Sequence, residues 1–133
     1  LLFLESLLPF STTRYPLVKV PHLDYVSSRW TDLDGQPVSR LRAGETAIIQ
    51  FKTSNPTRVH SIHENVTATV YMESSGEQVY RAWKVTPVAP SSTATYFFQF
   101  TPEAPGVYYY SLEAADGFKL AADASPRLLV EGS

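Results

Sequence analysis

The tightest group of possible metal ligands in the sequence is the segment His60-Ser61-Ile62-His63-Glu64. A bound metal ion would take His60 and His63 together with a third ligand, either Glu64 or the distant His22. Residues three apart point to opposite faces of an extended chain, but one turn of 3₁₀ helix would bring the two imidazoles together. The segment falls in a predicted loop, so solvated histidines without any ligand are the simpler alternative.

The triplet Asn65-Val66-Thr67, which follows directly, is an acceptor pattern for N-glycosylation. Alternation places Asn65 on the outer face at the start of a predicted strand, where a sugar would be accessible if the protein is extracellular. Catalytic patterns are missing from the sequence: there is no Gly-x-Ser-x-Gly turn, and Gly35, Gly44 and Gly76 are isolated rather than part of a phosphate loop. The sequence therefore predicts no enzyme, no catalytic residues and no cofactor.

The composition of the chain limits the number of domains and the kinds of partner and site that it can have. The 133 residues suffice for one domain with a proper core. The net charge is -2 and the Lys and Arg residues are scattered, which argues against a nucleic-acid partner. The absence of cysteine excludes disulfides, thiolate metal sites and cysteine nucleophiles.

The elements that would position these residues are strands. Tyr96, Phe98 and Phe100 alternate with polar or partly polar neighbours, which is typical of a strand with one buried face. A corner containing Pro102, Pro105 and Gly106 follows, and the chain is then β-branched and aromatic again from Val107 to Leu112. Tyr108, Tyr109 and Tyr110 must show both faces of that strand, one set filling the core and the other forming cross-strand pairs.

Further alternating segments predict a sandwich of two sheets. The first strand has Val26 and Trp30 as apolar anchors, and a later one places Val79, Trp83 and Val85 on one face with Arg81 among them. The spacing of the segments predicts an all-β, immunoglobulin-like β-sandwich of about 7–9 antiparallel strands. Besides the pair already described, the main predicted strands are Tyr25–Leu33, Thr46–Thr53, Asn65–Glu73, Gln78–Thr86 and Arg127–Glu131.

Residues 1–23 precede the predicted domain, which spans residues 24–133. The first ten residues are apolar but too few to cross a bilayer, which takes about 20. Tyr15–Pro21 is expected to be extended, because each proline biases the preceding residue toward β or polyproline II structure. The segment either packs on its own domain, docks into a neighbouring copy, or is the stub of a membrane anchor or signal peptide that has been removed. The candidate contact residues are Leu2, Leu4, Leu8, Val18 and Val20.

Three blocks of turn and core residues carry a resemblance to a known family. They are Asp34-Gly35-Gln36-Pro37-Val38 with the strand ending Thr53-Ser54-Asn55, then Gly76 with Ala82-Trp83 and Val88-Ala89-Pro90, and finally Phe100-Thr101-Pro102 with Gly106 and Tyr108. In this order they resemble the immunoglobulin-like CARDB-type modules of archaeal and bacterial cell-surface proteins, over about residues 25–131.

The resemblance implies a sandwich outside the cell, in surface-layer, adhesion or filament-associated proteins, and it supplies no catalytic residues. The expected function is a non-enzymatic structural or interaction module at the cell surface, with contacts through sheet edges and the N-terminal segment. Its partner would be another protein or another copy of the chain, with a membrane contact only through a removed N-terminal anchor. The alternative is a module that binds a metal or small ligand at the His60/His63 loop.

Overall fold

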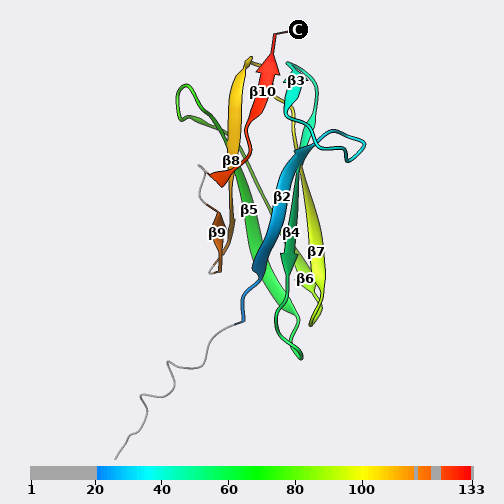
Figure 1. Ribbon diagram of the computed structural model, residues 1–133. Coiled ribbons are helices and arrows are strands. Elements are labelled where there is room, and N and C mark those ends of the chain that lie inside the picture. The colour runs from blue at the N-terminus through cyan, green and yellow to red at the C-terminus, as the bar shows by residue number, and fades with distance from the viewer. Residues whose placement is uncertain (1–20, 116, 121–123, 133) are drawn as a thin grey trace, which may run out of the picture.

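The protein is described here by a computed structural model that covers residues 21–115, 117–120 and 124–132. The apolar segment at residues 1–20, with all five of its candidate contact residues, lies outside the described residues. Nine strands occupy the described part (Figure 1). They are β2 (Asp24–Thr31), β3 (Arg40–Arg42), β4 (Ala47–Ser54), β5 (Ile62–Met72), β6 (Gln78–Val88), β7 (Thr93–Phe100), β8 (Gly106–Ala114), β9 (Lys119–Leu120) and β10 (Leu128–Glu131).

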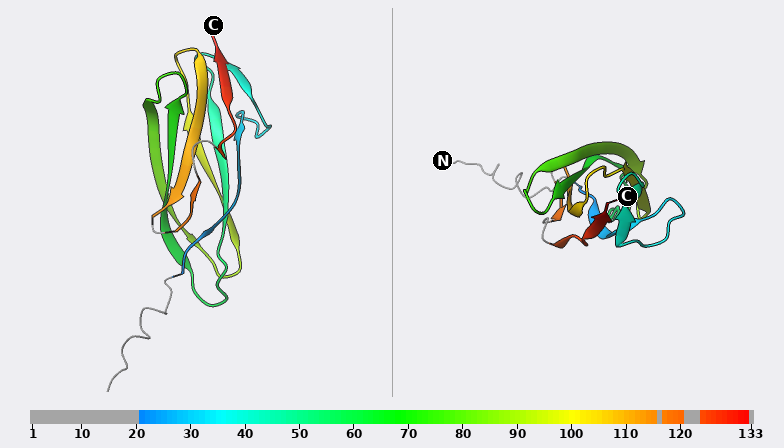
Figure 2. Two further views of the ribbon diagram at one scale, coloured as in Figure 1. Left: turned by 60° about the vertical axis from the view of Figure 1, so that its left-hand side comes forward. Right: turned by 90° about the horizontal axis from the view of Figure 1, so that it is seen from above.

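The strands form two sheets that face each other (Figure 2). The small sheet has the order β2-β4-β7, and the large sheet has the order β3-β10-β8-β5-β6, with β9 pairing with β8. This arrangement confirms the predicted all-β sandwich and its number of strands. One pair departs from the predicted antiparallel pattern, because β3 runs parallel to β10, with Leu41 beside Val130. The chain crosses from the small sheet to the end of the large one after β2 and arrives beside β10 in the same direction.

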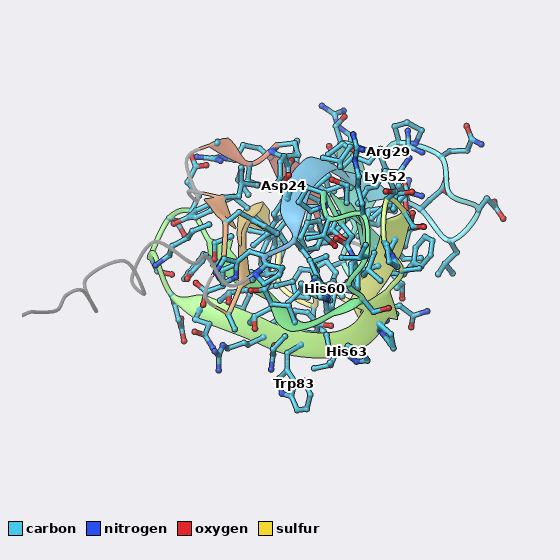
Figure 3. The ribbon with its side chains drawn as sticks, turned by 90° about the horizontal axis from the view of Figure 1, so that it is seen from below. Asp24, Arg29, Lys52, His60, His63 and Trp83 are labelled. Carbon is cyan, nitrogen blue, oxygen red and sulfur yellow. The ribbon has the colours of Figure 1, made fainter. Side chains whose placement is uncertain are left out.

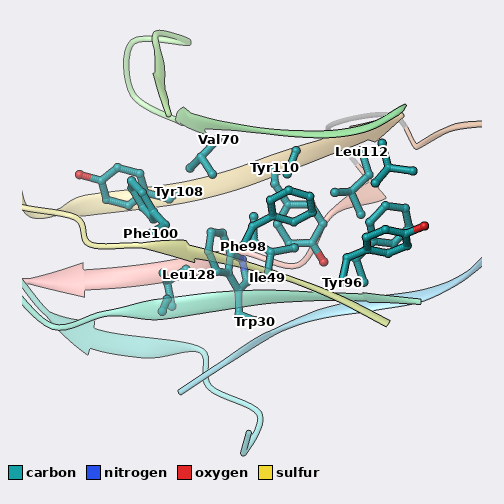
Figure 4. Close-up of a cluster of buried hydrophobic side chains, with 14 of the residues drawn as sticks. Trp30, Ile49, Val70, Tyr96, Phe98, Phe100, Tyr108, Tyr110, Leu112 and Leu128 are labelled. Atoms are coloured by element: carbon teal, nitrogen blue, oxygen red, sulfur yellow. The ribbon is translucent and has the colours of Figure 1, made fainter. Parts of the chain in front are cut away.

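The core lies between the sheets and is filled by alternate residues of the long strands (Figure 4). In β4 the buried residues are Ala47, Ile49 and Phe51, as the alternation predicts. Aromatic rings connect the two layers: the Trp30 ring of the small sheet meets the Tyr110 ring of the large sheet edge-on at 5.2 Å between centroids. Edge-to-face contact adds to the burial of both rings.

The polar ends of these buried rings are satisfied. Trp30 Nε1 donates a hydrogen bond to the carbonyl of Pro126 at 2.9 Å. The hydroxyl of Tyr110 shares a hydrogen bond with Ser28 Oγ at 2.8 Å, and burial raises the pKa of Tyr110 to about 12. A buried aromatic with a satisfied polar tip fixes both the depth and the direction of the ring.

The proline-containing corner between β7 and β8 carries the chain from one sheet to the other. β7 pairs with β4 and β8 pairs with β5, so the two strands are not hydrogen-bonded to each other. The Tyr108 hydroxyl donates to the carbonyl of Ala104 at 2.6 Å and its ring meets Phe100 edge-on. A tyrosine that bonds back to the loop just before its own strand is a hallmark of sandwich corners.

Substitution of two adjacent phenylalanines in β7 tests which face of the strand is buried in the core and which is exposed. Phe98 is 1% exposed and Phe97 is 47% exposed. We expect Phe98→Ala to lower the free energy of unfolding by about 3–5 kcal/mol, because it removes a buried ring and leaves a cavity. Phe97→Ala should cost less than about 1 kcal/mol. Urea denaturation of both variants measures the difference, and equal losses would contradict the assigned faces of β7.

Candidate functional site

Glu64, one of the predicted metal ligands, is instead a buried anchor for the start of the domain. It lies in β5 with its side chain inward and is 8% exposed. Its Oε1 accepts a hydrogen bond from the backbone N–H of Leu23 at 3.0 Å, and its Oε2 lies 2.9 Å from His22 Nδ1. Leu23 itself belongs to the core. Glu64 therefore fixes the chain at the point where it enters β2.

Of the two histidines of the predicted site, His60 is not brought together with Glu64, whereas His63 lines a hollow of about 330 Å³ with His22 and Glu64. His63 precedes Glu64 in β5, so its side chain points to the outer face while Glu64 points inward. His60 lies on the loop before β5, where its carbonyl accepts hydrogen bonds from Asn55 Nδ2 at 2.7 Å and Thr57 Oγ1 at 2.8 Å (Figure 3). Within the described ranges no three His, Asp or Glu residues form a group suited to hold a metal ion.

Asn65 lies on the outer face of β5, opposite Val85 of β6. Its side chain is half-buried and its Oδ1 accepts a hydrogen bond from Thr67 Oγ1 at 3.2 Å. Both residues of the acceptor pattern thus lie on one face. Glycosylation of Asn65 stays a prediction.

The most unusual surface of the described chain is the outer face of β6. Val79, Trp83 and Val85 project from it into solvent, and Trp83 is 62% exposed. Arg81 shares the face of Trp83, because residues two apart share a face of a strand, and Val79, at the register shift between Gln78 and Tyr80, is also exposed. Figure 3 shows Trp83 pointing away from the ribbon of the large sheet. We call Val79, Arg81, Trp83 and Val85 the β6 stripe.

The β6 stripe reverses the usual pattern, in which the more apolar face of a strand faces the core. The inner face of β6 presents Tyr80 and Ala82, which pack against the core, and then Lys84. Ala82 lies directly opposite Ala68 of β5, so two methyl groups face each other at this point of the inner face. A shift of one residue would bury Trp83, but it would also expose Val88, which is buried on the inner face.

Lys84 closes the gap between the free edges of the two sheets. Its Nζ donates to the carbonyl of Phe97 in β7 at 2.6 Å and lies 5.3 Å from the centroid of the Phe98 ring. β6 ends the large sheet and β7 ends the small one. An inward-pointing charge on an edge strand opposes pairing with an added strand. The exposed face of β6 is thus better suited to a contact than its edge.

Other aromatic side chains on the outer face of the large sheet are covered. Tyr71 and Tyr109 stack on each other across β5 and β8 with their centroids 5.4 Å apart, which confirms the predicted cross-strand pairing. The guanidinium of Arg127 lies 4.6 Å from the Tyr109 ring, and its Nε donates to Glu73 at 2.7 Å. The exposed apolar surface of this face is therefore concentrated on the β6 stripe.

The outer face of the small sheet carries the exposed ring of Phe97 and also a polar hollow. A hollow of about 480 Å³ is lined by Ser27, Ser28, Arg29, Gln50, Lys52 and Thr95. Arg29 Nε already donates to Gln50 Oε1 at 2.7 Å. No carboxylate or imidazole is among these described lining residues.

No protein-family model and no curated protein sequence matches the chain. Solved structures do match it. The C-terminal domain of Wzt aligns with a TM-score of 0.62 and 14% identity, covering 84% of this chain and 74% of that one. The CARDB domain of the PF1109 protein from Pyrococcus furiosus, solved in complex with di-metal ions, aligns with a TM-score of 0.53 and 13% identity over 85% of this chain and 96% of that one.

A β-glucosidase from Erythrobacter marinus also contains a similar part, with a TM-score of 0.63 and 9% identity over 83% of this chain but only 15% of that one. At these identities the likeness shows the fold alone. The chain has an immunoglobulin-like β-sandwich fold, and its likeness to CARDB-type modules, expected from the sequence, is confirmed at that level. In the ranges covered by the structure, no helix has the length and apolar character needed to span a bilayer.

The anchoring role of Glu64 can be tested against its neighbour in the strand. Glu64→Ala leaves the buried N–H of Leu23 without an acceptor, so we expect the free energy of unfolding to fall by about 1–3 kcal/mol. Glu64→Gln keeps an oxygen for that N–H and should lose less. His63→Ala, on the exposed face, should change stability by no more than about 0.5 kcal/mol. Urea denaturation checks all three variants, and a larger loss for His63→Ala than for Glu64→Ala would contradict the assignment.

Proposed function

We propose that this immunoglobulin-like sandwich is a non-enzymatic structural module of the cell surface that associates with other copies of the chain through the β6 stripe. The observation that carries the proposal is the reversed pattern of β6, in which Trp83 faces solvent while Ala82 and Lys84 face inward. Exposure of Trp83 and Val85 to water is unfavourable, and it is relieved when a partner covers them.

The composition of the stripe fits a protein partner. Tryptophan and arginine are the side chains most often found to dominate protein interfaces, and here they are two residues apart on one face. The rigid sheet beneath them means that little side-chain and backbone freedom is lost on binding. The large sheet supplies this rigidity, since β5 is paired on both sides along the segment opposite the stripe.

The extracellular site of action rests on the resemblance of the sequence to CARDB-type surface modules and on the acceptor pattern at Asn65. A sugar at Asn65 would stand beside Val85 and border the stripe. The metal-binding alternative at His60 and His63 gains no support from the geometry, because Glu64 is engaged on the opposite face of β5.

Association through the stripe is tested by comparing two exposed apolar residues. We expect Trp83→Ser to raise the dissociation constant of self-association at least about tenfold, which is the loss typical of a central interface tryptophan. Leu33→Ser is the matched control, because Leu33 is 66% exposed and lies on the turn after β2. It should leave the constant within about twofold. Sedimentation velocity of the full chain at several concentrations measures both, and a monomeric wild-type chain, or equal effects of the two substitutions, would refute the proposal.

The extracellular location has its own test. An antibody raised against the folded chain should label intact cells of the source organism without permeabilisation. Labelling with a membrane-impermeant amine reagent should reach Lys52 and Lys119, both of which are exposed. Signal that develops only after permeabilisation would show that the protein acts inside the cell.

A further inference from the structure

We infer that the occupant of the β6 stripe is the apolar N-terminal segment, residues 1–8, of a second copy of the chain. This inference rests on the proposed function and names the partner surface. It follows from the charge pattern of the stripe, from the chemistry of residues 1–8, and from the place where the described chain begins.

An occupant with one acidic group between apolar groups would complement the β6 stripe. Arg81 stands between Val79 and Trp83 on the outer face of β6. Among the ion pairs of the described residues none involves Arg81. An apolar partner without an acid would cover the guanidinium and leave its charge uncompensated, at a high desolvation cost.

Residues 1–8 have this composition. Their sequence is Leu-Leu-Phe-Leu-Glu-Ser-Leu-Leu, and Glu5 is the only acidic residue among the first twenty. In an extended chain Phe3, Glu5 and Leu7 share one face, and in a helix Leu1, Glu5 and Leu8 do so. In either conformation the carboxylate has an apolar side chain on both sides, which complements the valine–arginine–tryptophan order of the stripe.

The point where the described chain begins favours docking on a second copy. Pro21 lies at the end of the sandwich beside Ser61 and His63, and the Glu64 contacts hold His22 and Leu23 there. To reach its own β6 the chain would have to fold back along the sandwich, whereas a second copy can meet a segment that continues away from Pro21. Pro16 and Pro21 bias the residue before each of them toward extended structure.

The length of the segment allows contact with a neighbour. Pro21 comes sixteen positions after Glu5, and an extended chain of that length spans up to about 55 Å. Each copy would offer its segment at one end and its stripe along β6. Two different surfaces that meet head to tail produce an open chain of copies unless the rotation happens to close a ring.

Cross-linking between single cysteines tests the inference directly, because the natural chain contains none. Ser6→Cys and Gln78→Cys are made in two full-length chains that carry different tags, and the mixture is treated with a short bismaleimide. We expect a covalent heterodimer. The matched control replaces Gln78→Cys by Asp34→Cys, an exposed position on the turn after β2, and should give at most about a fifth as much product.

A charge exchange gives a second measure. Glu5→Arg and Arg81→Glu should each weaken self-association at least about fivefold, since each places like charges together. The variant that carries both should recover most of the wild-type association, which a merely structural role for either residue would not produce. Sedimentation velocity measures the three constants.

The outcomes separate the two levels of the proposal. If Trp83→Ser weakens association but the Ser6–Gln78 heterodimer and the charge rescue are both missing, the stripe has another occupant and this inference fails while the proposed function stands. If the doubly substituted chain Ser6→Cys, Gln78→Cys cross-links only within itself at high dilution, the segment docks on its own domain and the inference is overturned. If the wild-type chain does not self-associate, both fail.

Discussion

The contact between the aromatic rings of the two sheets is the interaction on which the rest of the structure depends. Trp30 from the small sheet packs against Tyr110 of the large sheet, and Phe100 packs against Trp30 and Tyr108 at the corner. The Trp30, Tyr108 and Tyr110 rings are each also held by a hydrogen bond at their polar end. A sliding motion of one sheet past the other would therefore break several contacts at once. The register of β8 is thereby set, and β5 and β6 follow from it by pairing.

This chain of pairing explains how an apolar face comes to lie outside. The inner side of β6 must fit a space already bounded by Ala68 of β5 and Phe100 of β7, and it does so with Ala82 and Tyr80. Strand geometry then sends Trp83 and its valine neighbours to the outer face. In β6 the packing of the core, rather than the hydrophobic pattern of the strand, decides which residues point inward. In natural sequences such a conflict between local pattern and fold is expected mainly at functional sites.

The sequence was sufficient to predict the sandwich, its corner and the buried face of β4, because alternation and proline placement are local signals. It located Val79, Trp83 and Val85 on one face, but it counted Trp83 among turn and core residues, and this was wrong, because Trp83 is 62% exposed on the outer face. The prediction from the sequence that Val26 is an apolar anchor was wrong. The register of β2 shifts between Tyr25 and Ser27, and this bulge leaves Val26 exposed. The contacts of Glu64 could not be predicted, because its partners, His22 and the N–H of Leu23, are about forty residues away in sequence.

The same geometry decides between two ways of joining such domains. Strand addition needs a free edge, and at the neighbouring edges of β6 and β7 the Nζ of Lys84 already binds the carbonyl of Phe97, which an added strand would use. A partner that displaced Lys84 would have to satisfy its charge elsewhere. A partner that lies on the outer face meets no such obstacle, and it finds apolar surface already exposed beside an unpaired arginine. The edge of β6 is thus protected while its face stays open, which is the combination expected of a domain that associates through specific side chains rather than through its backbone.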